Sequence, residues 1–461
     1  MRFLLPLLLL VATTATAQPR AAVQISGQWL GGVPAGTPSS EPLALTIVDA
    51  IARGLQHNLA LLNASDNVES ARGAQWTALA DLLPQVNGHV RESRQVVNLA
   101  AFGFPLPAGV PSIVGPFNVF DARVYVSQSI LNMEAIHSVR AKRHNLAAVQ
   151  YDVKSARDLV VLVSSSLYLQ ALAASARTDA SRAQMQTAEA TFRQASNLKD
   201  SGLVARIDVL RAEVQLATAR QRATAARNEF EKTKLQLARV IGLPLGQVFT
   251  LVDDLPFGPA PDLSLDAALE QAYKTRPDYQ AALERIRAAD SARRAVAGEW
   301  LPSVQVNADY GAIGLTPGDA HSTYTLVGAV SVPIFNGGRT RGRLIEAEAE
   351  LRRRRAEAED LRASIYYDVR TAFLDLQASG EQLEVATRAR DLSNEQLTQA
   401  RDRFTAGVAN NLEVVQAQEA VAEASERYIS ALYGYNLAKE MLARGLGIAE
   451  RATMQFLGGG R

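Results

Sequence analysis

The feature that most constrains the fold is a heptad repeat that fills residues 337–445. Large side chains recur at multiples of seven and a series of small ones accompanies them, which predicts two long helices with a close-packed, left-handed seam. A tight turn at Ala406-Gly407 separates the two helices. The large series is Val369, Leu376, Leu383, Leu397 and Phe404, then Val414, Val421, Tyr428, Tyr435 and Leu442; the small series includes Ala372, Ala386, Ala400, Ala417, Ala424, Ala431 and Ala438.

The same hairpin occurs a second time. Subtracting 205 from the positions of the second helix gives Val209, Leu216 and Leu237, and it places Ser201-Gly202 on the turn Ala406-Gly407. Further upstream, Leu83-Pro84 matches Leu301-Pro302 at an offset of 218. The chain is therefore predicted to be an internal duplication, with two interlocked halves of one fold.

Composition excludes several classes of function. The chain has 48 basic and 47 acidic residues, so nothing in its charge favours nucleic acid. It has no cysteine, which excludes disulfides, thiolate metal sites and a lipid anchor on cysteine. The five histidines are scattered and no nucleophile or phosphate-loop motif occurs, so we expect no enzyme, no cofactor and no metal site.

The N-terminus reads as an export signal. Residues 1–17 combine Arg2, an apolar run and an Ala15-Thr16-Ala17 cleavage site. Residues 18–41 are rich in Gly, Pro and Ser and are predicted to form an extended tail. No later segment is expected to span a membrane as a helix, so any membrane contact would be made through strands.

Two pairs of segments change to a period of two. Val304, Val306 and Ala308 alternate with polar residues, as is typical of tilted membrane strands of about ten residues. The predicted first repeat covers 42–252, with strands at about 85–101 and 117–131 and a helical hairpin at about 132–241. A linker at 253–262 leads to the second repeat at 263–449, with strands at about 303–313 and 322–335, a hairpin at about 337–445, and a tail at 450–461.

This organisation resembles the TolC-type outer membrane efflux proteins over nearly the whole mature chain. The most specific segments are Arg403–Gly407 followed by Leu412–Ala417, the copy at Ser201–Val204 followed by Ile207–Ala212, and Ser331–Gly338. The resemblance implies an α+β membrane protein that forms a homotrimer. Four strands per chain would close a twelve-stranded β-barrel in the outer membrane lipid, continued by a periplasmic α-helical barrel of coiled-coil hairpins.

Asp208 and Glu413 are the candidate periplasmic gate. They are equivalent across the repeat and follow the turn glycines by six positions, so a trimer would place six carboxylates near the closed end and favour cations. The alternative is that each acid only stabilises the first turn of its helix through the helix dipole. Family members carry aspartate at the first position; Glu413 and Gln416 depart from the family pattern, which implies a narrower or less charged gate.

The hairpin tips are the second candidate site. Glycine at each turn permits the left-handed backbone that such a turn needs. The resemblance implies that the tips meet a periplasmic adaptor protein, which connects the duct to an inner membrane transporter. The tip residues are Gly202, Leu203, Val204, Gly407, Val408 and Ala409.

The expected function is a passive exit duct of a tripartite efflux or type I secretion system. The alternative is a non-conducting periplasmic coiled-coil scaffold, in which protein rather than lipid covers the apolar strand faces. The basic run Arg352–Arg355 is interpreted as a solvated helix face, and Trp76 and Trp300 as packing residues.

Overall fold

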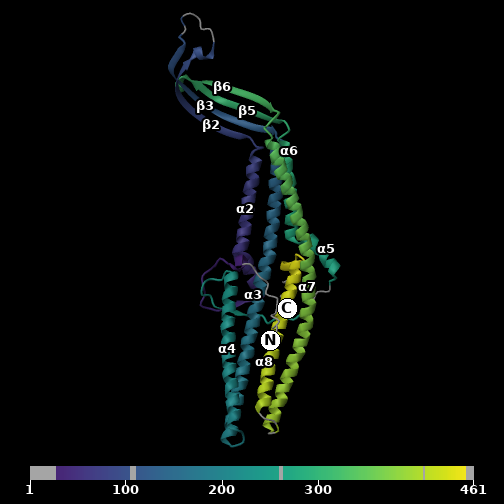
Figure 1. Cartoon of the computed structure of the whole chain (residues 1–461). Coiled ribbons are helices and arrows are strands. Elements are labelled where there is room, and N and C mark those ends of the chain that lie inside the picture. The colour runs from purple at the N-terminus through teal and green to yellow at the C-terminus, as the bar shows by residue number, and fades with distance from the viewer. Residues whose placement is uncertain are drawn as a thin grey trace, which may run out of the picture.

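The chain forms an elongated molecule with a sheet at one end and two hairpin tips at the other (Figure 1). The computed structural model describes residues 27–103, 109, 111–258, 263–406, 408 and 411–452, without the side chains of residues 28, 102 and 411. The leader at 1–17, most of the C-terminal tail and part of the linker lie outside the described residues. The long helices run side by side between the two ends, with a small mixed region about half-way along.

The sheet has four antiparallel strands in the order β2-β3-β5-β6. Their bounds are β2 Gln85–Asn98, β3 Ile113–Leu131, β5 Ser303–Gly314 and β6 His321–Ser331. The last strand ends four residues before the predicted 335, and the second begins four residues before the predicted 117. Pairing of Val124 with Tyr310, and of Tyr310 with Tyr324, keeps the alternating residues of neighbouring strands on one face.

The helices occur in pairs of nearly equal length. α1 Ile47–His57 and α5 Leu265–Thr275 have 11 residues each, and α2 Leu59–Ala80 and α6 Pro277–Gly298 have 22 each. α3 Met133–Asp200 and α7 Arg339–Thr405 have 68 and 67 residues, and α4 Arg206–Val240 and α8 Asn411–Gly445 have 35 each. The described residues also include three short 3-10 helices, at Gly27–Leu30, Leu99–Phe102 and Pro317–Asp319.

The predicted heptad seam is buried between α7 and α8. Val369, Leu376 and Leu383 are buried on α7, and they pack with Tyr435 and Leu442 of α8 in one apolar cluster. Near the hairpin tip Phe404 packs with Val414 in a second, smaller cluster. The seam prediction is confirmed because a period of seven keeps the same helix face toward its partner along the whole hairpin.

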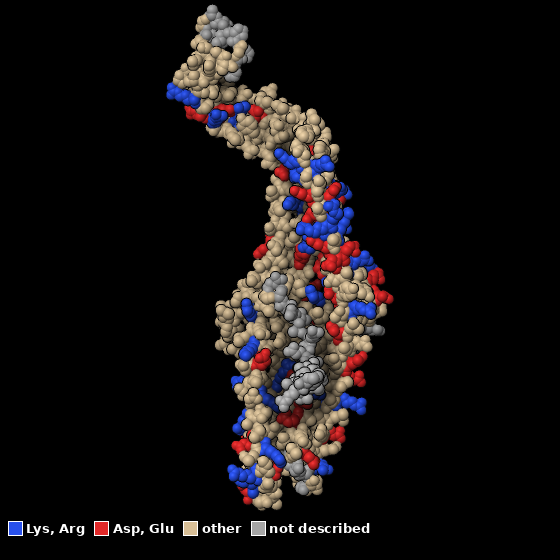
Figure 2. Space-filling model, in the orientation of Figure 1, with Lys and Arg blue, Asp and Glu red and all other residues tan. Residues whose placement is uncertain are grey.

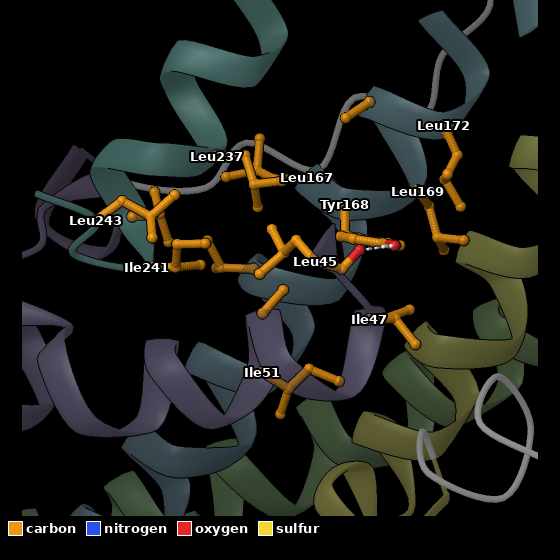
Figure 3. Close-up of a cluster of buried hydrophobic side chains, with 14 of the residues drawn as sticks. Leu45, Ile47, Ile51, Leu167, Tyr168, Leu169, Leu172, Leu237, Ile241 and Leu243 are labelled. Carbon is orange, nitrogen blue, oxygen red and sulfur yellow. Dashed lines mark hydrogen bonds between the residues drawn. The ribbon is translucent and has the colours of Figure 1, made fainter. Parts of the chain in front are cut away.

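The mixed region contains the largest cluster of buried apolar side chains (Figure 3). Two three-residue strands that the sequence analysis missed lie here, β1 Leu43–Leu45 and β4 Phe249–Leu251, and they pair in parallel. The hydroxyl of Tyr168 on α3 donates to the carbonyl of Leu45 at 2.8 Å and to Asp253 Oδ2 at 2.8 Å. Asp253, at the start of the predicted linker, also accepts from the backbone N–H of Ile47 at 2.7 Å.

Equivalent glycines in the two halves make equivalent close contacts. Gly242, after α4, has φ +63, and a Cβ there would lie 2.5 Å from the Cβ of His57 at the end of α1. Gly447, after α8, has φ +68, and a Cβ there would lie 2.8 Å from the Cα of Arg276 at the end of α5. Each hairpin therefore joins the preceding helix pair through a glycine that no other residue can replace without strain.

Three features of the chain were not predicted from the sequence. Trp76 and Trp300 are 62% and 46% exposed in the chain rather than packed inside it. The tail at 18–41 is not simply extended where it is described, because Gly32 forms a β-bridge with Asn58 and Val33 donates to the carbonyl of His57. α3 contains an 18-residue window of mean hydropathy 1.7, long and apolar enough by composition to cross a membrane, but 78% of this window is buried inside the protein. It therefore serves as a core segment.

Glu440 is an acid in the core between α8 and α3. Its side chain is only 2% exposed, and neither carboxyl oxygen has a hydrogen-bond partner among the described residues. The hydroxyl of the nearby Ser165 donates to the carbonyl of Val161 at 2.8 Å. Burial raises the pKa of Glu440 to about 8, and the nearby Ser165 hydroxyl and the charge of Lys439 partly offset this effect.

This acid predicts a fold that weakens as the pH rises. Because the folded chain keeps a proton on Glu440 that the unfolded chain loses near its ordinary pKa of 4.5, stability falls between about pH 4.5 and 8 by at most about 1.4 kcal/mol per pH unit. Glu440→Gln cannot ionise and should flatten this part of the profile. The check is denaturant unfolding of both proteins at pH 5.5 and 8.5; an equal pH dependence in both would contradict the assignment.

Candidate gate and hairpin tips

Both hairpins end at the same end of the molecule, opposite the sheet (Figure 1). At the first tip Gly202 has φ +74, its N–H donates to the carbonyl of Lys199, and the N–H of Leu203 donates to Leu198. At the second tip the N–H of Val408 donates to the carbonyl of Arg403, which is the equivalent bond. These bonds satisfy the last carbonyls of each long helix, so the predicted glycine role is confirmed for Gly202.

The tips present apolar side chains to solvent. Leu203 and Val408 are 72% and 69% exposed, and Val204 is half-buried. Gly407 and Ala409, also predicted as tip residues, lie outside the described residues. Two exposed aliphatic side chains at equivalent positions give each chain two similar apolar points at one end.

Asp208 and Glu413 each lie in the first turn of a helix, α4 and α8 respectively. Asp208 forms an ion pair with Arg211 of the same helix at 3.4 Å, and its side chain is 19% exposed. Glu413 forms an ion pair with Arg403, across its hairpin turn, at 3.3 Å and is 44% exposed. The chain thus brings each acid to a basic partner in its own hairpin, an arrangement compatible with both the gate and the helix-dipole interpretations.

A set of polar contacts that the sequence did not predict ties one hairpin to the other. Arg177 of α3 binds Glu426 of α8 at 2.9 Å and donates to Ser430. Arg222 of α4 binds Glu419 of α8 at 3.0 Å. We call these two ion pairs the hairpin links; Gln215 and Glu419, and Thr191 and Gln418, add hydrogen bonds of 2.6 and 2.8 Å.

The hairpin links border a crevice of about 800 Å³ between α3, α4 and α8. Gln416 also lines this crevice. No sequence motif predicts these contacts, because they depend on which faces of the two hairpins meet, and the hairpins are far apart in the sequence. The only signal in the sequence is opposite charge on helices that the duplication makes neighbours.

The two faces of the sheet differ in chemistry. Apolar side chains stand exposed on one face, among them Val86, Val90, Tyr310, Tyr324, Leu326 and Val330. On the other face Arg123 binds Asp121 on its own strand and Asp309 across the pairing with β5 at 3.2 Å. A sheet with an exposed apolar face and a charged opposite face suits contact with lipid on one side and water on the other. Among the described residues no group of three or more histidines and acids could hold a metal ion.

A sheet with one apolar and one charged face, continued by long helical hairpins, is typical of proteins that insert strands into a membrane and extend helices away from it. Residues 50–243 and 268–448 match the family described as outer membrane efflux protein, and the chain belongs to that family. Its members are channels rather than enzymes, and the chain is an outer membrane exit duct for efflux or secretion.

The chain is 24% identical to the pyoverdine export outer membrane protein OpmQ of Pseudomonas putida KT2440, over 82% of this chain and 80% of that protein. It is 22% identical to outer membrane protein TolC of Escherichia coli K12, over 69% of this chain and 67% of TolC. The Campylobacter jejuni CmeC outer membrane channel has the same fold, with a TM-score of 0.75 at 17% identity, over 94% of this chain and 93% of that one.

Proposed function

We propose that three copies of the chain close a twelve-stranded barrel. The observation that carries this proposal is that β2 and β6 are the edges of the four-stranded sheet and each pairs on one side only among the described strands. Open edges cannot face lipid, because unpaired backbone groups there cost several kcal/mol each. Pairing β6 of one copy with β2 of the next continues the antiparallel order, and three copies leave an open lumen.

The helical flanks support the same assembly. α7 exposes Tyr367, Leu374, Val385 and Leu392, which are separated by seven, eleven and seven residues and so share one helix face. α4 exposes Ile207, Leu210, Val214 and Leu235. We call these the α7 and α4 stripes. In the trimer the α7 stripe of one copy packs against the α4 stripe of the next, which covers apolar surface that a lone chain leaves in water.

The proposal also assigns roles to the N-terminal segment, the hairpin tips and the two repeats. The N-terminal segment 1–17 directs export, and the chain carries no lipid on cysteine. Leu203 and Val408 meet a periplasmic adaptor, an inner membrane transporter supplies the energy, and the duct itself is passive and catalyses no reaction.

Two repeats, 42–252 and 263–449, build the wall of the duct. The matched glycine contacts at Gly242 and Gly447 support this duplication. The scaffold alternative is less well supported, because it leaves the exposed strand face without a cover.

Asp208 and Glu413 act as the periplasmic gate in this proposal. Six carboxylates at the narrow end favour cations, so neutralising them in Asp208→Asn and Glu413→Gln should lower the ratio of potassium to chloride permeability about twofold or more. The measurement is the reversal potential of purified protein in planar bilayers under a salt gradient, after its mass has been shown to be that of a trimer.

The outcomes separate the interpretations. A trimer whose selectivity is unchanged in the double variant assigns the two acids to the helix dipole alone. A protein that is not trimeric, or that never opens a pore with or without the substitutions, contradicts the proposed duct. Glu423→Gln is the control for loss of an acid away from the gate, because Glu423 lies on the same helix as Glu413 and pairs with Arg427 at the next turn.

A further inference from the structure

The junction between the sheet and the helices carries two exposed indoles. Trp76 lies near the end of α2, just before β2, and Trp300 follows α6, just before β5. Their side chains are 62% and 46% exposed in the single chain. Tryptophan prefers the boundary between lipid tails and water. The two indoles therefore mark the level at which the apolar strand face gives way to the head groups.

Arginines lie at the same level, on the helices that leave the sheet. Arg140 is seven residues into α3, about 10 Å along the helix, and Arg294 is four residues from the end of α6. Arg339 and Arg341 begin α7. Figure 2 shows Lys and Arg side chains gathered over the upper parts of α6 and α7, below the sheet.

Three of these arginines keep their charge uncompensated. All four are exposed. Arg294 binds Asp290 at 2.8 Å, whereas no acid of the described part of the chain forms an ion pair with Arg140, Arg339 or Arg341. The nearest acids of this level, Glu134 and Glu299, are held by Arg343. The total charge of the chain is close to zero. Guanidinium groups without an ion-pair partner among the described residues nevertheless gather at the junction between the sheet and the helices.

The residue between Arg339 and Arg341 fixes their directions. Thr340 is fully buried, and its hydroxyl donates to Glu299 Oε2, just past the end of α6, at 2.7 Å. Positions one residue before and after it are rotated by about 100° in opposite senses. Since Thr340 faces the neighbouring helix within the wall, Arg339 and Arg341 project from opposite faces of that wall. In the proposed barrel, one of the two therefore faces lipid and the other faces the lumen.

We propose that the outward arginine of this pair, with Arg140 and Arg294, forms a collar that binds the phosphates of anionic phospholipids in the inner leaflet of the outer membrane. Guanidinium groups bind phosphate through paired hydrogen bonds and give up their hydration readily. The indoles above them hold the acyl-chain boundary. The collar rests on the proposed trimeric barrel, because only a closed wall separates a lipid side from a lumen side.

The test uses lipids with brominated acyl chains, which quench nearby tryptophan. Purified full-length trimer is reconstituted in phosphatidylcholine vesicles, with brominated phosphatidylglycerol or brominated phosphatidylcholine added in increasing proportion. Trp76 and Trp300 report quenching, while Trp29 in the mixed region supplies a constant background. The wild type should prefer the anionic lipid by about fivefold for each free outward arginine, and 1 M salt should remove most of this preference.

Single substitutions decide the assignment. One of Arg339→Gln and Arg341→Gln should lose about fivefold of the preference, and the other should keep it. Arg355→Gln is the matched control, because Arg355 is an exposed arginine of the same helix about 24 Å further from the sheet and outside the ion pairs of the described chain. Equal quenching by both lipids in the wild type, loss in both or neither of the two variants, or an equal loss in the control would overturn the collar.

Conductance of the same proteins separates this proposal from the proposed duct. If the trimer conducts normally and shows no lipid preference, the collar is wrong and the duct stands. If no trimer forms, the collar fails together with the assembly on which it rests.

Discussion

Replacing Glu419 and Glu426 with glutamine is expected to raise the open fraction of the tube about 100-fold. These acids form the hairpin links, which tie α8 to α3 and α4. Each link is about half exposed and should contribute about 0.5 kcal/mol, so the six links of the proposed trimer should hold the described arrangement by about 3 kcal/mol. Swinging the α7/α8 hairpin away from α3 and α4 breaks all six, and the double variant no longer resists that motion.

Single-channel recording in planar bilayers measures this effect as the fraction of time spent in the high-conductance state. Glu423→Gln is the control, because Glu423 lies on the same helix between the two link acids but pairs with Arg427 of α8 itself. An unchanged open fraction in the double variant, or an equal rise in the control, would show that the links do not hold the tube. High salt should mimic the double variant in the wild type, since it screens part-exposed ion pairs.

Gly242→Ala is expected to cost about 2–5 kcal/mol of folding free energy. The left-handed backbone, φ +63, costs an alanine about 1–2 kcal/mol, and its Cβ would overlap the Cβ of His57 and the carbonyl of Val33, at 2.5 and 2.6 Å. The overlap involves backbone and the root of a side chain, so relief requires the tail or α1 to move. The joint between the first hairpin and the helix pair α1/α2 should loosen.

Gly246→Ala is the matched control for this second prediction. Gly246 also has a positive φ, +83, but nothing lies within 4 Å of a Cβ there. The control should therefore lose only the backbone cost, about 1–2 kcal/mol. Denaturant unfolding of detergent-solubilised protein compares the two; equal losses would mean that the close contact with His57 contributes nothing. Gly447→Ala should repeat the larger loss, because its Cβ would meet the backbone of Arg276.

Periodicity made the long elements predictable. A seam such as Val369, Leu376 and Leu383 works at every turn of the helix, so its signal accumulates over the hairpin. The alternation of apolar and polar residues made β5 and β6 predictable in the same way. The three-residue strands β1 and β4 are too short to show a period in the sequence, and Tyr168, which bonds to Leu45 and Asp253 beside them, lies far away along the chain.

The site was predictable in part for the same reason. Gly202 was found because a helical turn demands a left-handed residue at a fixed place. The partners of Asp208 and Glu413 depend on side-chain directions at the tips, and the hairpin links depend on how two hairpins 200 residues apart meet. Trp76 and Trp300 are exposed in the single chain, which is opposite to the expected packing.

The two stripes on opposite flanks have a genetic consequence. In the proposed ring each copy uses its α4 stripe toward one neighbour and its α7 stripe toward the other, so a copy damaged only in the α7 stripe still offers a sound α4 stripe. Such a chain can join a growing ring without completing it. In a cell that makes damaged and intact chains in equal amounts, random mixing leaves about one ring in eight wholly intact. Substitutions that damage the α7 stripe would therefore be dominant. A chain that never folds would enter no ring and would leave the rings of intact chains unaffected.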